Sequence, residues 1–346
     1  MILVIYGTRP EAIKLVGCVA AARAKGLPVH VHCTMQSPDL VDQSILPWDS
    51  RGEVNWSSAG TVPSLVVVQG DTRTAFESAV WAYQAGVPVF HVEAGVRTYD
   101  LASPWPEEGY RQMISRIATY HACSTSRCVD NLASERMRGA ERYADGVFGV
   151  TPHPAPVRTR KDSRFVRVTG SPVVESVRQR RASQGEAVPS SYAVITLHRR
   201  ENRGHFIDIL RGIAGGLGDL GYYWYSHPNG WAVQENTTEL RARAPLEGSM
   251  FAAVIGYAKV VITDSGGVQE ECNALGVPCV VCRTVTDRPE SLGAGGAYLG
   301  GVTVESVAAA IREALARTDP IDTSIFGDGT ASIQVANWWA EIMEAK

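Results

Sequence analysis

The chain has 346 residues, of which 45% are hydrophobic and 20% are charged, a globular composition with more length than one hydrophobic core usually takes. Its 33 basic and 36 acidic residues give a formal net charge of −3, which offers no electrostatic footprint for nucleic acid or an anionic membrane surface. The sequence starts with a strand pattern instead of a signal segment, and no apolar run is long enough to span a membrane. We therefore expect a cytoplasmic protein of two domains that binds neither nucleic acid nor membrane.

Short β-rich runs alternate with longer helical patterns, and this alternation occurs twice along the chain. The pattern predicts an α/β fold of βαβ units, with a mostly parallel sheet in each half. In the first half the predicted strands cover residues 2–6, 29–33, 65–68 and 87–92. In the second half they cover residues 193–197, 222–225, 260–263 and 278–282, with an amphipathic helix over residues 206–217.

The change of domain is predicted near residues 168–172, where a strand ends in turn residues before a helical stretch over 173–181. This gives an N-terminal domain over residues 1–170 and a second domain over residues 171–333. Residues 293–301, G-A-G-G-A-Y-L-G-G, are dense in glycine. Two interpretations stay open for them, a flexible loop beside a ligand and an ordinary turn.

The seven cysteines are an odd number scattered through apolar stretches, which favours reduced thiols over a disulfide framework. Cys279 and Cys282 form a C-x-x-C pair, which a redox or zinc site would also show. No second pair stands at zinc spacing, however, and the surrounding run V-P-C-V-V-C is apolar. A buried strand is the favoured interpretation, and we expect no metal site.

The stretch G-T-R-P-E-A-I-K at residues 7–14 follows the first strand and leads into a helix, the place where α/β sheets bind ligands. It is neither G-x-G-x-x-G nor a Walker loop, so NAD-dependent hydride transfer and ATP hydrolysis lack their usual sequence support. Pro10 suits the first helical turn, which leaves Arg9 and Lys14 as cations beside the site. For each of these two alone, a solvated surface charge is the default alternative.

A second candidate is D-S-G-G-V-Q-E-E at residues 264–271, again between a strand and a helix. Ser265 is a plausible N-cap, and Gly266 and Gly267 leave room for a phosphate to approach the free N–H groups of the helix start. The alternative is a capped helix start without a ligand.

Acidic residues follow the strands of the first half: Asp71 in Q-G-D-T, Glu93 in H-V-E-A-G, and Glu107 and Glu108 in S-P-W-P-E-E. Isolated acids at such positions are usually solvated or capping groups. Their convergence on one sheet edge favours proton transfer, which needs positioned carboxyl groups. In the second half, His198, Arg199 and Arg200 end a predicted strand, and guanidinium groups suit the oxygens of a diphosphate.

The motifs resemble one family when they are taken in order. GTRPEAIK, GDT, HVEAG, SPWPEE, HRREN, TDSGG and RPE begin at Gly7, Gly70, His91, Ser103, His198, Thr263 and Arg288. This combination resembles the non-hydrolysing UDP-N-acetylglucosamine 2-epimerases over most of the chain. The resemblance implies two Rossmann-like domains in a GT-B arrangement, an active site in the interdomain cleft, and UDP held mainly by the second domain. It also implies a homodimer and a last helix, over residues 334–346, that crosses back onto the first domain.

Site residues carried over from the family fall on matching positions. The acid and base candidates are Asp71, Glu93, Glu107 and His198. The candidates for binding the UDP-sugar are Arg9, Lys14, Arg111, Arg199, Phe251, Ser265, Gly266, Gly267, Glu271 and Arg288. In this assignment Phe251 contacts uracil, the helix start at Ser265 holds phosphate, and Glu271 accepts hydrogen bonds from the ribose hydroxyls.

The implied reaction interconverts UDP-GlcNAc and UDP-ManNAc. Because C2 of an N-acetylhexosamine has no neighbouring carbonyl, the C1–O bond is expected to break first, which acidifies the C2 proton for a carboxylate. Re-addition of UDP to the resulting 2-acetamidoglucal, with protonation from the other face, gives the epimer. No cofactor is needed. The alternatives are a hydrolysing epimerase that releases ManNAc and UDP, a glycosyltransferase of the same architecture, and a non-catalytic sugar-nucleotide sensor.

Several positions depart from the family pattern. Residues 36–39 read Q-S-P-D where family members carry Q-H-R, and residues 46–63 form a shortened segment. In bacterial members this region helps to bind a second UDP-GlcNAc as activator, so the chain is expected to lack that allosteric site. Tyr110 replaces an asparagine of the P-E-E-x-N-R pattern, and residues 226–229 compress an H-x-N-P stretch.

Overall fold

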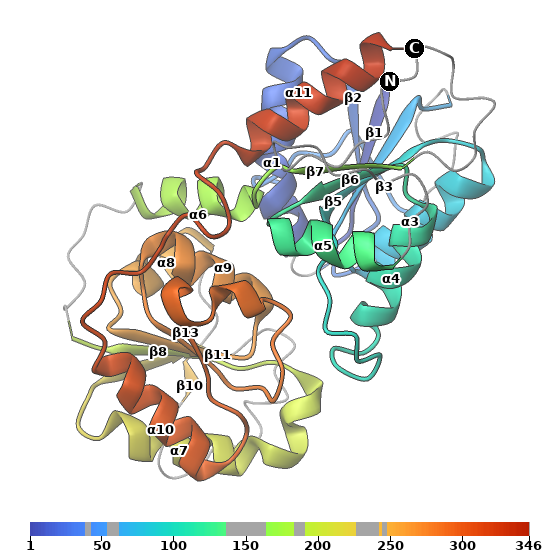
Figure 1. Cartoon of the computed structure of the whole chain (residues 1–346). Helices are drawn as coiled ribbons and strands as arrows, with labels where there is room; N and C mark the ends of the chain where they lie inside the picture. The colour runs from blue at the N-terminus through green and yellow to red at the C-terminus, as the bar shows by residue number, and fades with distance from the viewer. Residues whose placement is uncertain are drawn as a thin grey trace. The chain divides into compact units, whose positions relative to one another are not determined.

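The computed structural model describes residues 1–38, 43–53, 62–135, 164–182, 191–225, 242–243 and 248–345. The chain divides into two compact units, one of Met1–Glu175 with Gly327–Lys346 and the other of Ser176–Phe326 (Figure 1). In the part of the chain given by these ranges, no helix combines the length and the apolar character that crossing a membrane requires. The departure noted at residues 226–229 lies outside the described residues.

The first unit contains a parallel sheet with the order β3-β2-β1-β4-β5-β6-β7 in its described residues. Its strands are β1 (Ile2–Tyr6), β2 (Val29–Cys33), β3 (Ser50–Arg51), β4 (Leu65–Gln69), β5 (Val89–Ala94), β6 (Tyr120–Cys123) and β7 (Phe165–Val168). Helices α1 (Arg9–Ala24) and α11 (Ala331–Glu344) cover one face, and α3 (Arg73–Gln84), α4 (Glu107–Ile117) and α5 (Ser126–Ser134) the other. The strand order reverses at β1, and such switch points create crevices at the carboxyl ends of strands.

The second unit contains a parallel sheet with the order β10-β9-β8-β11-β12-β13 in its described residues. Its strands are β8 (Ala193–Thr196), β9 (Tyr222–Tyr225), β10 (Ala242–Arg243), β11 (Val260–Thr263), β12 (Cys279–Val281) and β13 (Ala297–Leu299). Its helices are α7 (Phe206–Leu217), α8 (Gly248–Gly256), α9 (Gly266–Leu275) and α10 (Val304–Leu315), while α6 (Pro172–Ala182) contains the unit boundary. The described residues of this unit also include the 3-10 helices η2 (Arg200–His205), η4 (Pro289–Ser291) and η5 (Gly293–Gly295). Helices α7 and α10 approach closely at Gly212. A Cβ there would lie 2.8 Å from the carbonyl oxygen of Val304, so a larger side chain would not fit.

The prediction of an α/β fold with two Rossmann-like units is confirmed by these two parallel sheets. The glycine-dense segment 293–301 forms η5 and β13, so the flexible-loop interpretation is wrong. Gly296 has φ 82°, and a Cβ there would lie 2.5 Å from the Ile321 side chain, which explains the glycine by close packing. All seven cysteines lie in the described part of the chain as buried free thiols, as the sequence suggested.

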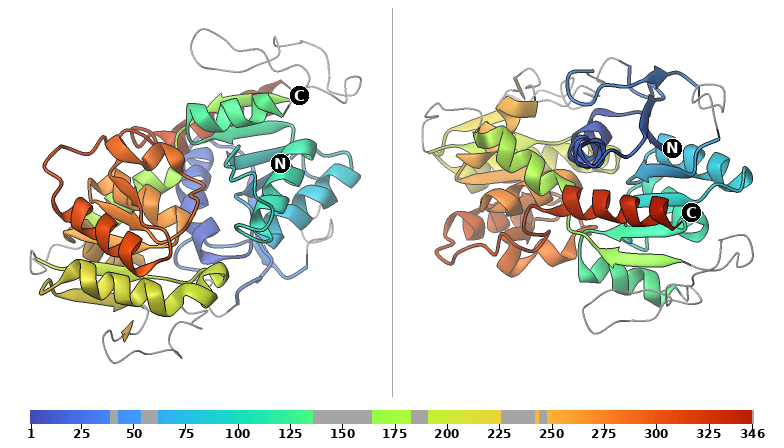
Figure 2. Two further views of the ribbon diagram at one scale, coloured as in Figure 1. Left: turned by 60° about the horizontal axis from the view of Figure 1, so that its bottom comes forward. Right: turned by 90° about the horizontal axis from the view of Figure 1, so that it is seen from above.

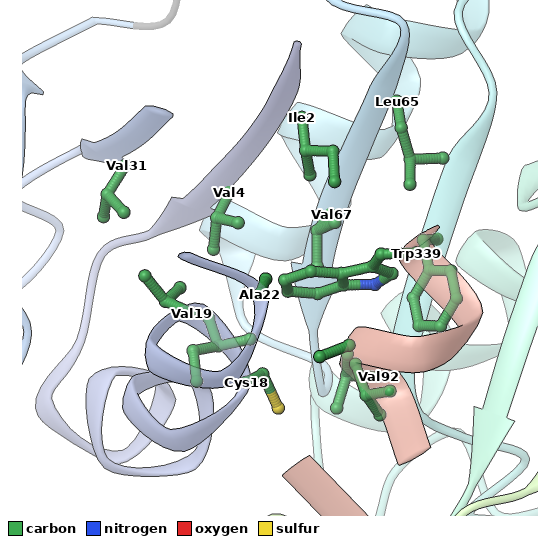
Figure 3. Close-up of a cluster of buried hydrophobic side chains, with 14 of the residues drawn as sticks. Ile2, Val4, Cys18, Val19, Ala22, Val31, Leu65, Val67, Val92 and Trp339 are labelled. Carbon is green, nitrogen blue, oxygen red and sulfur yellow. The ribbon is translucent and has the colours of Figure 1, made fainter. Parts of the chain in front are cut away.

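The C-terminal helix α11 completes the core of the first unit. It packs beside α1 on one face of the sheet (Figure 2). Trp339 is fully buried and lies among Ile2, Val67 and Cys18, which come from two strands and α1 (Figure 3). Phe90 contacts the Trp339 ring edge-on, with the centroids 5.9 Å apart. Residues more than 300 positions apart in the sequence therefore share one apolar cluster.

We expect Trp339→Ala to lower the free energy of unfolding by about 3–5 kcal/mol, because it leaves a cavity where the ring fills the core. Trp105→Ala is the matched control, since that side chain is 66% exposed, and it should change stability by less than about 0.5 kcal/mol. Urea unfolding followed by circular dichroism measures both. Equal effects of the two substitutions would contradict the packing role of Trp339.

Candidate functional site

The candidate residues divide between the two units. The first unit carries Arg9, Lys14, Asp71, Glu93, Glu107 and Arg111. The second carries His198, Arg199, Phe251, Ser265, Gly266, Gly267, Glu271 and Arg288. Most of them lie at the carboxyl ends of parallel strands or in the helices that follow, which is where open α/β sheets bind ligands.

The turn between β1 and α1 is fixed by Glu11, a buried residue that was not among the sequence candidates. Its carboxylate accepts the N–H groups of Gly7 and Thr8 at 3.0 and 2.8 Å. It also accepts the hydroxyls of Thr8 and Thr72, both at 2.7 Å. Burial raises the pKa of Glu11. The T-x-x-E pattern of a capping box is the sequence signal that could have identified this bracing role. Arg9, in the first turn of α1, is half-buried.

Glu93 stands at an irregularity near the end of β5. The register with β6 shifts between Val92 and Ala94, and Glu93 itself has φ 66°, which is uncommon for a residue with a side chain. Its carboxylate oxygen Oε2 accepts hydrogen bonds from Lys14 Nζ and from Gln69 Nε2. The Lys14 and Glu93 side chains are 11% and 8% exposed, so this ion pair is largely shielded from water.

Asp71, in the turn after β4, is paired with Arg111 of α4. Arg111 also lies 3.4 Å from Glu108, whose side chain is fully buried. Glu108 accepts the backbone N–H groups of Thr98 and Tyr99 at 3.0 and 3.1 Å. Arg111 therefore links a half-exposed carboxylate to a buried carboxylate that braces a loop.

The adjacent acids Glu107 and Glu108 have different surroundings, a distinction that the sequence does not reveal. Glu108 is buried and bonded to backbone, whereas Glu107 is half-buried at the start of α4. The positive end of the helix dipole favours a carboxylate at that place. Of the two, Glu107 has the surroundings suited to proton transfer.

Two buried histidines lie side by side on β5 and β6. His91 donates from Nε2 to the carbonyl oxygen of Gly70 at 2.7 Å, and His121 donates from Nε2 to that of Ser115 at 3.2 Å. Burial lowers the pKa of His91 to about 4 and that of His121 to about 3. Both rings are therefore neutral at neutral pH, and His91 helps to hold the turn that carries Asp71.

In the second unit, a buried aspartate organises the loop that follows β8. Asp264 accepts the backbone N–H groups of His198 (3.0 Å) and Arg199 (2.9 Å) and the side-chain amide of Asn202 (3.0 Å). Burial raises the pKa of Asp264. His198 Nδ1 lies 3.3 Å from the same carboxylate. Burial, followed by the charges of Arg199 and Arg283, lowers the pKa of His198 to about 3, so its imidazole is neutral at neutral pH.

The start of α9 offers backbone N–H groups with little steric obstruction. Ser265 stands at the N-cap position, but its side chain makes no capping hydrogen bond, and the first turn contains no acidic residue. A Cβ on Gly267 would meet nothing closer than Ser265 Oγ at 4.0 Å. A Cβ on Gly266 would lie 3.0 Å from a carboxylate oxygen of Asp287. Such a helix start can accept an anion.

Arg288 is 4% exposed and lies in a buried ionic cluster. It pairs with Glu270 of α9 and lies 3.5 Å from Asp287. Arg283 contacts Asp287 at 3.3 Å. In this structure the Arg288 guanidinium thus interacts with two carboxylates of its own unit.

Glu271 and Phe251 lie on the helices that flank the same sheet. Glu271, in α9, accepts a hydrogen bond from Arg180 of α6 at 3.0 Å, and both side chains are mostly buried. Phe251 is half-buried in α8. Arg180 and Asn202 were not among the sequence candidates, because nothing local marks an arginine or asparagine as the partner of a distant acid. No group of three or more His, Cys, Asp or Glu residues within the described ranges could hold a metal ion.

The chain is similar to known proteins over most of its length, including parts of both units. A family model described as UDP-N-acetylglucosamine 2-epimerase matches residues 57–339. The UDP-N-acetylglucosamine 2-epimerase of Bacillus subtilis is 30% identical in sequence, over 96% of this chain and 93% of that protein. The structure of S. aureus MnaA with UDP has a TM-score of 0.80 and 25% identity, covering 100% of this chain and 97% of that one. The UDP-GlcNAc 2-epimerase of Neisseria meningitidis, bound to UDP-GlcNAc, has a TM-score of 0.77 and 25% identity, covering 98% and 99%.

The buried histidines generate a prediction about stability and pH. Because the folded-state pKa of His121 is about 3 and the unfolded value is near 6.5, the unfolded chain binds this proton first as the pH falls. The imidazole therefore lowers stability progressively from about pH 6.5 down to about pH 3, by up to about 1.4 kcal/mol per pH unit. We expect His121→Gln to make the loss of stability on acidification shallower by that amount.

Urea unfolding at several pH values between 7 and 4 measures the two slopes. The difference between wild type and variant is the informative quantity, because buried carboxyls with raised pKa, such as Glu11 and Asp264, contribute slopes of the opposite sign. Identical slopes would show that His121 takes up its proton in the folded state as readily as in the unfolded one.

Proposed function

The chain belongs to the UDP-N-acetylglucosamine 2-epimerase family, and from that premise we propose that it interconverts UDP-GlcNAc and UDP-ManNAc. The observation that carries the proposal for this chain is the Glu93 carboxylate, which stands on left-handed backbone and is bonded to Lys14 and Gln69. A shielded carboxylate with a defined orientation is suited to remove a proton from carbon.

The proposed reaction begins with cleavage of the C1–O bond and departure of UDP. Positive charge at C1 acidifies the proton on C2, and a carboxylate removes that proton to give a 2-acetamidoglucal. UDP then adds back to C1 while C2 receives a proton on the opposite face. Each step conserves charge and atoms without a redox cofactor, and an acid or base is needed on each face of the ring.

We assign the acid–base roles to Glu93, Asp71 and Glu107 of the first unit and to His198 of the second. Arg111 supports the assignment of Asp71, since the ion pair between them favours the ionised carboxylate. With its pKa lowered to about 3, the imidazole of His198 is neutral, so one ring nitrogen can donate a hydrogen bond and the other can accept one; the tautomer decides which nitrogen does which.

We assign UDP binding mainly to the second unit. The open start of α9 at Ser265, Gly266 and Gly267 supports a role in holding phosphate oxygens. The further proposed contacts follow the family positions: Phe251 to uracil, Glu271 to the ribose hydroxyls, and Arg9, Lys14, Arg111, Arg199 and Arg288 to the charged or sugar portions.

We also propose a homodimer, as the family resemblance implies. Helices α3 and α4 support it, because Phe76 and Tyr110, both half-buried, stack with ring centroids 4.9 Å apart. Tyr83 and Met113 of the same helices are 60% and 44% exposed. Apolar side chains of this kind suit a two-fold interface, in which the same patch of each copy meets its equivalent.

The central test is hydrogen exchange at C2. We expect incubation with UDP-GlcNAc in deuterium oxide, without added NAD or metal, to place deuterium at C2 of both recovered sugar nucleotides, because the C2 proton is removed to a group that exchanges with solvent. Nuclear magnetic resonance of the sugars measures it. Glu93→Gln, Asp71→Asn and Glu107→Gln should each lower turnover by about two orders of magnitude or more.

Glu77→Gln provides the control for these variants. Glu77 is an exposed acid that pairs only at the surface with Arg73 at 2.7 Å, so its amide should retain wild-type exchange. Turnover with full retention of protium in the wild type would refute the elimination mechanism. Free ManNAc as the product would instead identify a hydrolysing enzyme.

A second test concerns regulation. We propose that the chain lacks an activating second UDP-GlcNAc site, on the basis of Ser37, Pro38 and the shortened segment over residues 46–63, of which residues 54–61 lie outside the described ranges. UDP-ManNAc freed of its epimer should then react at once with hyperbolic kinetics, since no coupling free energy from an activator is needed. Initial rates with and without a small UDP-GlcNAc supplement decide the matter, and strong stimulation by the supplement would contradict the proposal.

A further inference from the structure

Gln69 is the last residue of β4 and is only 3% exposed. Its Nε2 donates to Glu93 Oε2, the same oxygen that Lys14 binds. We propose that Gln69 is a positioning residue that sets the orientation of the Glu93 carboxylate for proton transfer at C2. This inference rests on the proposed epimerase function, and nothing in the chemistry requires Gln69 to touch the sugar itself.

Glu93 needs such a partner because neither its backbone nor its side chain fixes the carboxylate. The register shift beside Glu93 and its φ of 66° take it out of the regular alternation of β5, and irregularities of this kind re-aim side chains near active sites. The last torsion of a glutamate, which turns the carboxylate plane, is broad and only weakly restricted by sterics. Hydrogen bonds from fixed donors must therefore define that plane.

The position of Gln69 is itself fixed relative to β5. Gln69 is the register partner of Val92, the residue before Glu93. In the next position the N–H of Gly70 donates to the carbonyl oxygen of Val92 at 2.9 Å, and His91 donates back to the carbonyl oxygen of Gly70 at 2.7 Å. The residue directly after Gln69 is thus joined to β5 by two hydrogen bonds, and Gln69 itself lies in register with Val92, so the donor and the acceptor stand on paired strands.

The chemistry of the amide suits this role. Lys14 supplies the positive charge that compensates the shielded carboxylate, and its ammonium on a flexible stem acts as a point charge with little directional preference. The amide of Gln69 adds a second hydrogen bond from a planar group and leaves the net charge of the pair unchanged. Lys14 is thereby suited to keep Glu93 ionised, and Gln69 to keep it oriented.

The experiment compares Gln69→Met, which has similar length but no donor, with Gln69→Asn, which keeps the amide on a side chain one methylene shorter. Deuterium incorporation at C2, kcat, KM for UDP-GlcNAc, Kd for UDP and Tm are measured for each. We expect Gln69→Met to lower kcat and the exchange rate by about 10- to 100-fold, the scale of misplacing a reacting group by about 1 Å. KM and the Kd for UDP should stay within two-fold of wild type.

Asn131→Leu is the matched structural control. Asn131 of α5 donates its side-chain amide to the carbonyl oxygen of Gly95, two residues after Glu93, at 2.9 Å, and does not contact the carboxylate. This variant should lower Tm while retaining exchange within about three-fold, since it removes an equivalent hydrogen bond without freeing Glu93.

The outcomes separate the two proposals. Absence of exchange in the wild type refutes the proposed function, whereas normal exchange in both wild type and Gln69→Met refutes only the role of Gln69. Parallel losses of exchange, UDP affinity and Tm in Gln69→Met, or failure of both Gln69 variants to fold, would assign Gln69 a structural role and overturn the inference.

Discussion

The central interaction of the first unit's candidate site is that of the Glu93 carboxylate, shielded from water near the end of β5, with an ammonium and an amide. Removing a carboxylate from water costs several kcal/mol unless charge and hydrogen bonds replace the lost hydration. Around Glu93 these replacements include Lys14, which α1 contributes, and Gln69, which β4 contributes. The order of the sheet makes this possible, because β1, β4 and β5 are neighbours and α1 and β4 approach the end of β5 together. The positive φ at Glu93 contributes to this contact, because a regular strand would direct the Glu93 side chain elsewhere.

Five acids of the two units are held in two different ways. Glu11, Glu108 and Asp264 accept backbone N–H groups, so each of them fixes a loop or a helix start. Asp71 and Glu93 are held by the side-chain cations Arg111 and Lys14 instead. A carboxylate bonded to backbone N–H groups holds a loop in place through those bonds, whereas one bonded to a side chain can exchange that partner without a change in the backbone.

Much of the fold follows from local sequence, whereas the pairings of the site do not. The ranges expected for β1, β2, β9, β11 and α7 match the structure: apolar or aromatic runs mark β1, β9 and β11, alternating valines mark β2, and a helical period marks α7. Strands β6 and β13 were not predicted. The polar residues Tyr120 and His121 obscure the strand pattern of β6, and the flanking glycines obscure that of β13. The positions of the acids after strands were predicted from the sequence, whereas the T-x-x-E signal at Glu11 is present in the sequence but was not among the predictions. The contact of Lys14 with Glu93 joins residues 79 positions apart and depends on sheet order, which a single sequence does not reveal.

The ionic cluster beside α9 limits how the second unit can receive an anion. Arg283 and Arg288 carry two positive charges, and Asp287 and Glu270 carry two negative ones, so the cluster is neutral as a whole. Asp287 lies next to Gly266, where an uncompensated carboxylate would repel a phosphate at the helix start. In this conformation Arg283 and Arg288 offset the charge of Asp287, which reduces its repulsion of an anion at the start of α9. For the proposed phosphate site, the attraction in this conformation would come from the N–H groups and dipole of α9 and from Arg199, whereas the proposed contact of Arg288 requires its guanidinium to leave a carboxylate partner.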